Sequence, residues 1–316
     1  MYEGKTIAVV VPAYNEEKLI GEVLRTMPDF VDLIIVVDDA STDQTLDAAA
    51  SYCRQLGDRL VLLPHKENQG VGAAITSGYK QALAREVAVV AVMAGDAQMD
   101  PADLERVVAP VARGEADYVK GNRLFRGESW QMIPHYRYLG NAVLSLLTKI
   151  ASGYWHIADS QSGYTAIARI ALERLDLDHI YTRYGMPNDL LVKLNVGNFR
   201  VHDVSIRPVY HIGEISGIRL RKVIPTIAWL LLRGFCWRLT EKYVLRDFHP
   251  LVFFYCMGLM LFPAGTILGL YLLWYRFFVG TVAATSALLA AFLIISGLQA
   301  LFFAMWFDMD YNKHLK

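Results

Sequence analysis

Two long segments near the C-terminus contain no charged residue, and this feature constrains the fold more than any other. They run from Leu251 to Tyr275 and from Thr281 to Phe307. A helix needs about 20 residues to cross a hydrocarbon core of about 30 Å. Buried helices of a soluble protein rarely continue so far without charge, and aromatic residues near the ends of both segments are typical of a bilayer interface. The sequence therefore predicts two transmembrane helices, at about 251–275 and 281–307.

The linker between these segments, RFFVG, is so short that the two helices are expected to form a tight hairpin. The linker contains one basic residue, whereas many basic residues precede the first segment. Because positively charged loops stay in the cytoplasm, we expect a multi-pass protein of the cell membrane with a cytoplasmic N-terminal domain and a short cytoplasmic tail. The basic residues before the first segment are Arg219, Arg221, Lys222, Arg233, Arg238, Lys242 and Arg246.

Residues 217–246 combine an apolar run that is too short to span, VIPTIAWLLL, with scattered basic residues and two tryptophans. This mixture predicts one or two amphipathic helices in the membrane interface, although a core helix of the preceding domain has a similar pattern. The expected division of the chain is 1–212 for an N-terminal domain, 213–248 for interfacial helices and 249–316 for the hairpin and tail.

In the N-terminal domain, short apolar runs at 7–11, 33–37, 60–63 and 87–93 alternate with helical patterns at 16–27, 43–56, 69–84 and 101–113. Further helices are predicted at 136–151 and 186–195. Such alternation predicts an α/β fold with a mostly parallel sheet and helices on both faces. Ligands bind such sheets outside the carboxyl ends of the strands. Those ends carry PAYNE, DDASTD, HKENQGVG and AGDAQMD, which we expect to surround one site.

Overall charge and cysteine content exclude some functions. Lys and Arg together number 31, as do Asp and Glu, so the chain has no basic excess that would indicate a nucleic-acid partner. The three cysteines, Cys53, Cys236 and Cys256, lack the spacing of a metal site, and a cytoplasmic domain would keep them reduced.

The first two strand ends read VVVPAYNEE and VVDDASTDQT. Each alone indicates a strand–turn–helix, with Asn15 capping one helix and Ser41 or Thr42 capping the next. Together they resemble the family 2 glycosyltransferases with the GT-A fold, which have PxYNE and DDxSxDxT at these places. The resemblance implies a nucleotide-sugar pocket lined by Pro12, Ala13, Tyr14, Glu16, Asp39, Ser41, Asn68, Gly70 and Gly72.

The layout of this domain, followed by interfacial helices and two spans, is similar to that of the polyprenyl-phosphate sugar synthases of this family, which include dolichyl- and undecaprenyl-phosphate enzymes. The resemblance implies inverting transfer of a hexose from a nucleotide-diphosphate sugar, UDP-glucose-like or GDP-mannose-like, to a polyprenyl phosphate. The expected partners are these two substrates and membrane lipids. By analogy with related two-span proteins, a homo-oligomer is a further expectation.

These enzymes usually carry D-x-D-x-Q after the fourth strand, where this chain has Ala94, Asp96 and Gln98. The resemblance implies that Asp96 and Gln98 bind Mg²⁺ or Mn²⁺, together with diphosphate oxygens, and that the missing first carboxylate weakens the site. Asp100, which precedes Pro101, is predicted to be a helix cap instead.

Acceptor binding is assigned by the same resemblance to Arg123 and Arg137, with a contribution from Asn141, because guanidinium groups suit phosphate oxygens. Asp159 in ADSQSGYTAI matches the family's D-x-x-S-G-[FY], and Asp189 is the second candidate for its role. A phosphate acceptor is already ionised above its second pKa of about 6, so it needs little base catalysis. Asp159 is therefore expected to orient groups, with a general base as the open alternative.

Three other functions share some of these features. A processive polysaccharide synthase would carry Q-x-x-R-W near the interfacial helices, and the sequence has none. A glycolipid synthase with a lipid hydroxyl acceptor would need Asp159 as a base. A non-catalytic membrane protein that only binds a nucleotide sugar is favoured by Ala94 and opposed by Asp96 and the two arginines.

Overall fold

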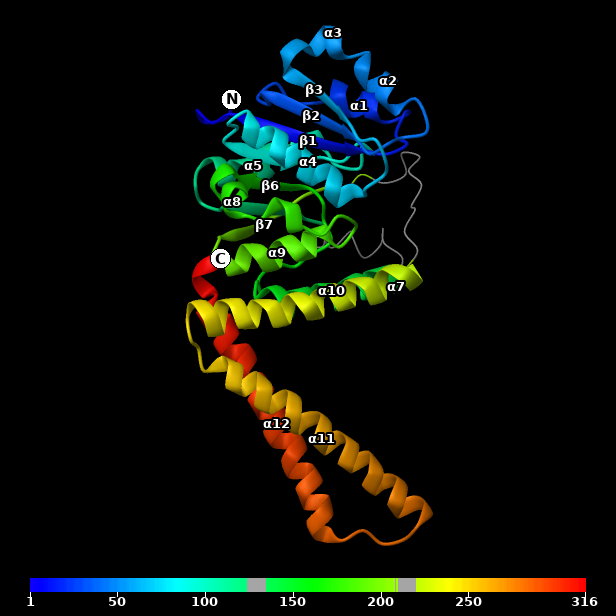
Figure 1. Cartoon of the computed structure of the whole chain (residues 1–316), viewed down its shortest axis with the longest axis vertical. Coiled ribbons are helices and arrows are strands. Elements are labelled where there is room, and N and C mark those ends of the chain that lie inside the picture. The colour runs from blue at the N-terminus through cyan, green and yellow to red at the C-terminus, as the bar shows by residue number, and fades with distance from the viewer. Residues whose placement is uncertain (124–134, 208, 210–219) are drawn as a thin grey trace. The chain divides into compact units, whose positions relative to one another are not determined.

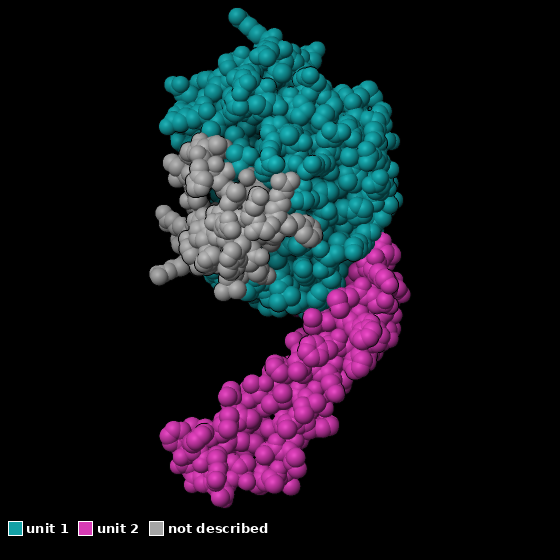
Figure 2. All heavy atoms as spheres, turned by 180° about the vertical axis from the view of Figure 1, so that it is seen from behind, with its two compact units in different colours: residues 1–235, 315–316 teal, residues 236–314 magenta. Residues whose placement is uncertain are grey.

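The computed structural model describes residues 1–123, 135–207, 209 and 220–316, and it describes the backbone but not the side chains of 135–142 and 220–223. The described chain forms two compact units. One comprises 1–235 with 315–316, and the other comprises 236–314. Figure 2 colours them separately. The structural units are defined by contacts, so the predicted functional division at 212 and 248 stays a prediction.

In the first unit, seven described strands form one sheet in the order β3-β2-β1-β4-β6-β5-β7. Strand β6 runs antiparallel to β4 and β5, and the other neighbours are parallel, so the predicted mostly parallel α/β sheet is confirmed. The four strands predicted from the sequence correspond to β1, β2, β3 and β4. The bounds are β1 (Ile7–Ala13), β2 (Leu33–Asp38), β3 (Leu60–Pro64), β4 (Val89–Val92), β5 (Tyr118–Asn122), β6 (Thr165–Ala168) and β7 (Val201–Ser205).

Hydrophobic layers lie on both faces of the sheet because successive side chains of a strand point to opposite sides. Val10 and Ile35 face one layer, and Val9 and Ile34 face the other. Every residue of β1 and β2 is buried, as is typical of parallel strands covered on both faces. The first layer includes α4 (Val71–Ala84), α8 (Arg169–Arg174) and α9 (Met186–Val196), and the second includes α1 (Ile20–Arg25), α2 (Thr45–Ala50) and α5 (Leu104–Ala112).

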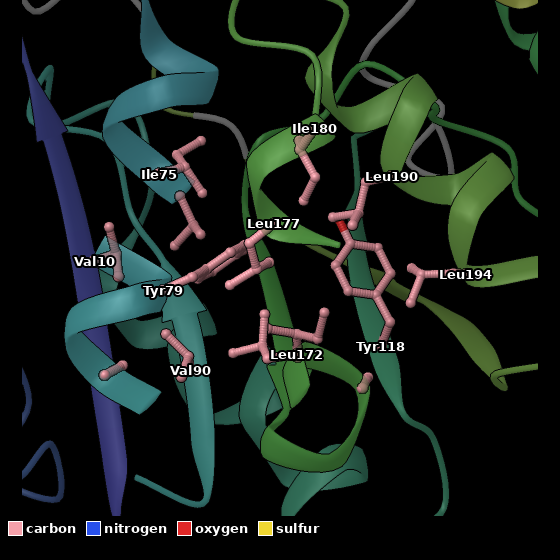
Figure 3. Close-up of a cluster of buried hydrophobic side chains, with 14 of the residues drawn as sticks. Val10, Ile75, Tyr79, Val90, Tyr118, Leu172, Leu177, Ile180, Leu190 and Leu194 are labelled. Carbon is pink, nitrogen blue, oxygen red and sulfur yellow. The ribbon is translucent and has the colours of Figure 1, made fainter. Parts of the chain in front are cut away.

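Two tyrosines occupy the centre of the first layer. Tyr79 of α4 and Tyr118 of β5 are each 1% exposed, and Figure 3 shows them among aliphatic side chains from the sheet, α8 and α9. Large rings fill the space where the antiparallel strands β6 and β5 join the parallel part. This packing makes β5 a firm support for the residues that follow it.

Several helices differ from the prediction at their ends. The helix predicted at 16–27 begins only at Ile20, and the one predicted at 43–56 is split into α2 and α3 (Cys53–Leu56). The helix at 101–113 starts with a 3₁₀ turn, η2 (Pro101–Asp103), before α5, and further 3₁₀ turns are η1 (Gly57–Arg59), η3 (Leu177–His179) and η5 (Lys313–Leu315). α1 starts late because Asn15 and Glu16 form hydrogen bonds to the loop after β2.

The later predicted helices are present as α7 (His135–Ser152) and α9. Beside them lies α10 (Leu220–Thr240), and Figure 1 shows α7, α9 and α10 together in this part of the molecule. Ala151, Val192, Ile227 and Leu231 form a small buried cluster that joins the three helices. The opposite side of α10 is apolar as well, since Trp229 is 67% exposed.

The second unit contains the two predicted long apolar helices, α11 (Leu251–Phe278) and α12 (Ala284–Tyr311), preceded by a π-helical turn, η4 (Glu241–Arg246). Each has 28 residues and is long and apolar enough to cross a membrane. Their backbones approach closely at glycines: a Cβ on Gly297 would lie 2.4 Å from the backbone N of Phe262. The predicted pair of long apolar helices is confirmed. Both end later than predicted, at Phe278 and Tyr311, and the second begins later, at Ala284.

Candidate active site

The loops after β1 and β2 are joined by hydrogen bonds at the carboxyl edge of the sheet. The side-chain oxygen of Asn15 accepts from the backbone N of Thr42 at 2.8 Å, and the backbone N of Asn15 donates to Ser41 Oγ at 3.0 Å. Asn15 has a φ of 58°, a left-handed conformation that asparagine tolerates. The backbone N of Glu16 donates to Thr45 Oγ1 at 2.8 Å. These bonds occupy the residues that would otherwise have begun α1.

The predicted caps in these loops are wrong. The residue before α1 is Leu19, and the residue before α2 is Gln44; neither helix has a side-chain cap. Asn15 instead holds the second loop, and the Ser41 hydroxyl donates to Asp38. Polar side chains that can cap a helix can also fasten a turn, and here the second use prevails.

Asp39 fastens the loop that follows β3. It is 3% exposed, and its carboxylate accepts from the backbone N of Gln69 at 2.9 Å and of Gly70 at 2.7 Å. Its Oδ1 also lies 2.8 Å from Nδ1 of His65, whose Nε2 lies 2.9 Å from Ser77 Oγ. The two carboxylate oxygens of Asp39 therefore contact His65 and the backbone N of Gln69 and Gly70, and these contacts fix the loop that borders the predicted nucleotide pocket.

Gly70 and Gly72 allow this loop to pack tightly. Gly70 has a φ of 98°, and a Cβ there would lie 2.6 Å from the carbonyl oxygen of Thr182. A Cβ on Gly72 would lie 2.4 Å from the carbonyl oxygen of Tyr181. Asn68 donates from Nδ2 to the backbone oxygen of Asp39 at 3.2 Å. The two glycines thus let this loop pack against residues 181–182, and the hydrogen bonds to Asp39 hold its predicted pocket residues at the end of β2.

The loop after β4 is hydrogen-bonded to the last residues of β1, and this brings Asp96 close to Glu16. The backbone N of Gly95 donates to the carbonyl oxygen of Pro12 at 3.0 Å. Burial, followed by the charges of Asp96 and Asp43, raises the pKa of Glu16 to about 7. Asp96 is half-buried, and its Oδ1 accepts from the backbone N of Gln98 at 3.1 Å. Glu16 and Asp96 therefore form an acidic spot at the centre of the sheet edge.

The donors at this spot fit a hard divalent cation that keeps water and substrate oxygens in its shell, because they are oxygen ligands. Within the described part of the chain, no group of three or more His, Cys, Asp or Glu side chains could hold a metal by itself. Asp100 is separate: its carboxylate accepts from the backbone N of Ala102 at 2.9 Å with Pro101 at the first position, which confirms the predicted cap.

Arg123 and Asp159 form an ion pair beyond the end of β5. Nε of Arg123 lies 2.7 Å from Oδ2 of Asp159, and Nη2 lies 3.2 Å from Oδ1. Asp159 is 1% exposed. Its burial acts to raise its pKa, but the charges of Arg123 and Lys120 outweigh this, and its pKa is lowered. An ionised, paired carboxylate of this kind suits an orienting role better than that of a base.

Of the other residues predicted to bind or orient the acceptor, Asp189 is described with its side chain, whereas Arg137 and Asn141 are not. The side chains of Arg137 and Asn141 lie outside the described residues, although the backbone of α7 that carries them is described. Asp189, the second candidate for the role of Asp159, accepts from the backbone N of Tyr181 at 2.9 Å and pairs with Lys193. Asp189 thus holds the start of α9 to the preceding loop.

Sequence reasoning missed three polar residues beneath this ion pair. Lys120 and Asn122 of β5 are both fully buried, and Asn122 donates to Asp203 of β7 at 2.9 Å. Lys120 donates to the backbone oxygen of Ser162. The signal was the stretch KGN inside an otherwise apolar strand, which reads as a surface loop unless the strand is recognised.

Comparisons with known proteins agree with this architecture. The family model described as "Glycosyl transferase family 2" matches residues 8–176. A UDP-N-acetylglucosamine–dolichyl-phosphate N-acetylglucosaminyltransferase of Methanococcus voltae is 28% identical over 218 residues, covering 65% of this chain and 86% of its own. A polyprenol monophosphomannose synthase of Mycolicibacterium smegmatis is 28% identical over 234 residues, covering 72% of this chain and 87% of its own.

A solved structure of similar fold is glucosyl-3-phosphoglycerate synthase from Mycobacterium tuberculosis, in complex with Mn²⁺, UDP and phosphoglyceric acid. It is 22% identical, with a TM-score of 0.53, and the match covers 74% of this chain and 78% of that chain. A parallel-rich sheet with this strand order, whose first four strand ends meet at one edge, defines a glycosyltransferase domain of the GT-A fold. The chain belongs to glycosyl transferase family 2.

Proposed function

We propose that this glycosyltransferase passes a hexose from a nucleotide-diphosphate sugar to a polyprenyl phosphate, with inversion, at the cytoplasmic face of a membrane. One observation carries the proposal: two relatives aligned over 65% and 72% of this chain are named as a dolichyl-phosphate N-acetylglucosaminyltransferase and a polyprenol monophosphomannose synthase. The two apolar helices, each 28 residues long, would hold the enzyme where such an acceptor is found.

The donor would bind over the joined loops at the carboxyl edge. Tyr14 is 46% exposed there and offers a ring face to the base, whereas Asp39 and Ser41 maintain the shape of the pocket. The remaining pocket residues in the proposal are Pro12, Ala13, Glu16, Asn68 and Gly70. Backbone groups of these loops would contact the ribose and diphosphate.

Asp96 would hold a divalent metal, with Gln98 beside it and Glu16 close by. When bound, Mg²⁺ or Mn²⁺ would neutralise the charge that builds on the leaving nucleoside diphosphate. The fit rests on the chemistry of the donors: burial, followed by the charges of Asp96 and Asp43, raises the pKa of Glu16, and a cation beside these oxygens would offset both effects.

The acceptor phosphate would bind to the guanidinium groups of Arg123 and Arg137, with Asn141 contributing a hydrogen bond. Asp159 keeps the Arg123 side chain in place through its two contacts of 2.7 and 3.2 Å. A phosphate oxygen attacks the anomeric carbon as the bond to the diphosphate breaks, so no proton needs to be removed. Catalysis in this proposal is orientation plus electrostatic stabilisation, and the single displacement inverts the anomeric centre.

The test is to incubate membranes containing the full chain with a panel of nucleotide sugars and a polyprenyl phosphate, and to identify sugar-lipid products by mass spectrometry. We expect one donor to give product, and Asp96→Ala to reduce turnover by about 100-fold or more. Asp100→Ala, a matched change in the neighbouring helix cap, should keep most of the activity. Absence of sugar-lipid from every donor would contradict the proposal.

Asp159→Asn distinguishes the two kinds of acceptor. With a phosphate acceptor the variant should keep measurable turnover, because the nucleophile is already ionised. With a lipid hydroxyl acceptor the same variant should lose turnover, because a base is then needed. Products formed from a panel of lipid alcohols but not lipid phosphates would assign the enzyme to glycolipid synthesis.

A further inference from the structure

Lys120 and Asp203 are charged side chains inside the fold that the proposed reaction does not use. They are register partners on the neighbouring parallel strands β5 and β7. Lys120 is fully buried, and its ammonium group donates to the backbone oxygen of Ser162. A buried cation that forms no contact with a substrate costs free energy, so its place beneath Arg123 and Asp159 calls for an explanation.

Asp203 connects β7 to the segment that carries Asp159. Its Oδ2 accepts from the backbone N of Ala158 at 2.7 Å and from Nδ2 of Asn122 at 2.9 Å. Its Oδ1 is buried and has no hydrogen-bond partner among the described residues. Since Ala158 is the residue before Asp159, Asp203 determines where the backbone of Asp159 lies.

These residues form one electrostatic group with alternating charge. Lys120 is attracted by Asp159 and by Asp203, and it is repelled by Arg123. Arg123 in turn holds Asp159 by the bidentate contact. In a buried setting such charges interact strongly, so removing one member changes the balance at the others.

We propose that Lys120 and Asp203 are positioning residues for the acceptor: together they fix Asp159, and through it the guanidinium of Arg123, in the orientation that receives the lipid phosphate. The inference rests on the proposed function and deepens it, because it extends the acceptor site into the fold by two residues that do not touch the substrate.

The arrangement has a consequence for pH dependence. The charged groups that face Asp203 are Lys120 from β5 and Asp159 from the segment before β6, with Asn122 as a neutral partner. Burial raises the pKa of Asp203 to about 6. When Asp203 takes up a proton, Lys120 has Asp159 as its remaining carboxylate in this group and competes with Arg123 for it. Acceptor use should therefore fall as the pH drops through about 6.

The experiment measures kcat/KM for the polyprenyl phosphate with the purified full chain at about pH 7.5 and about pH 5.5. The wild type is compared with Asp203→Asn, which mimics the protonated side chain. The ionised fraction of a carboxyl with a pKa of about 6 falls about fourfold when the pH is lowered from about 7.5 to about 5.5. The wild-type advantage over Asp203→Asn should shrink by about that factor, with the donor KM unchanged. Titration of the acceptor phosphate is common to both enzymes and cancels.

Asp117→Asn is the matched control. Asp117 precedes β5, and its carboxylate accepts from the backbone N of Arg200 at 2.7 Å, outside the group around Lys120. This variant should follow the wild-type pH profile. The same pH effect in Asp117→Asn, or a pH-independent ratio between wild type and Asp203→Asn, would overturn the inference. A wild-type enzyme that makes no sugar-lipid would instead contradict the proposed function.

Lys120→Gln provides a second measurement. Alone it leaves Asp159 paired with Arg123 and Asp203 without its cation, so we expect acceptor kcat/KM to fall by about tenfold or more with the donor KM unchanged. Combined with Asp203→Asn, the pair buries no unmatched charge, and the double variant should recover part of the loss. If Asp203→Asn alone does not fold, the double variant compared with Lys120→Gln decides the question. Strictly additive losses would overturn the inference.

Discussion

Asp159 and Asp203 lie in one buried group, yet their pKa values move in opposite directions. Arg123 contacts both oxygens of Asp159, and the pKa of that carboxyl is lowered. Asp203 is held by a backbone N–H and by an amide, and burial raises its pKa to about 6. The difference is the guanidinium of Arg123, which compensates Asp159 for the loss of water. Asp203 has no such contact among the described residues, and its Oδ1 is buried without a hydrogen-bond partner there.

Asp203→Asn should therefore stabilise the protein at neutral pH. The carboxyl has a folded pKa of about 6 against an ordinary value of 3.8, so its protonation stabilises the fold at low pH, and this contribution is lost as the pH rises through 6. At pH 7.5 the rise of this pKa from 3.8 to about 6 makes the ionised group unfavourable by about 3 kcal/mol, a cost that the amide avoids. Thermal unfolding midpoints in detergent should favour the variant at pH 7.5, differ less at pH 5, and converge with the wild type only as the pH approaches the ordinary value of 3.8.

The opposite sign is expected for Asp159→Asn. The lowered pKa of Asp159 means that its ionised form adds stability above its ordinary pKa, and that this is lost as the pH falls through the folded value. The variant should melt below the wild type at neutral pH. If both variants melted below the wild type by similar amounts at every pH, the electrostatic account of this pair would be wrong.

At the scale of elements, the sequence predicted what depends on local pattern. Strands β1, β2 and β4 are apolar runs because both of their faces are buried, and such runs are visible without a structure. Strand β3 is apolar as well, although it lies at the edge of the sheet and is partly exposed. Strands β5 and β7 pair although they lie about 80 residues apart in the sequence. They carry the polar residues Lys120, Asn122 and Asp203, so the sequence pattern did not predict them as strands. Long-range pairing, and not propensity, decides those strands.

The same limit applies to the site. Because parallel strands end at one edge, the convergence of the four polar loops followed from the order of elements. The hydrogen-bond partners of each side chain could not be predicted in this way, since Asn15 and Asp39 form hydrogen bonds to loops that are distant in sequence. A polar residue after a strand has several uses, and the tertiary contact selects among them.

The α11–α12 pair gives a prediction of its own at this scale. A Cβ on Gly297 would lie 2.4 Å from the backbone N of Phe262, whereas a Cβ on Gly269 would have Ile294 Cδ1 as its nearest neighbour at 3.8 Å. Gly297→Ala should force the helices apart and cost about 1–3 kcal/mol. Gly269→Ala should leave the thermal midpoint in detergent close to that of the wild type. Equal midpoints for the two variants would show that close backbone contact does not stabilise the pair.

At the scale of the whole molecule, the second unit carries a buried polar group at the end of its apolar helices. Arg238 and Asp308 are fully buried and form an ion pair of 2.7 Å, and the Tyr243 hydroxyl donates to Asp308 at 2.6 Å. These contacts join the residues just before α11 to the last turns of α12. The segments that enter and leave the hairpin are thereby held together, so both should lie on one side of the membrane.

Labelling of single cysteines tests that arrangement. Cys53, Cys236 and Cys256 are all exposed, so Cys236 and Cys256 are first changed to serine. The basic residues before α11 predict a cytoplasmic domain, so a membrane-impermeant maleimide is expected to label Cys53 in inverted vesicles and not in intact cells. With Cys53 also replaced, Gly280→Cys in the linker, where a Cβ meets no atom within 4 Å, should label in intact cells. Labelling of both sites from the same side would exclude a spanning hairpin, and the reverse pattern would invert the proposed orientation.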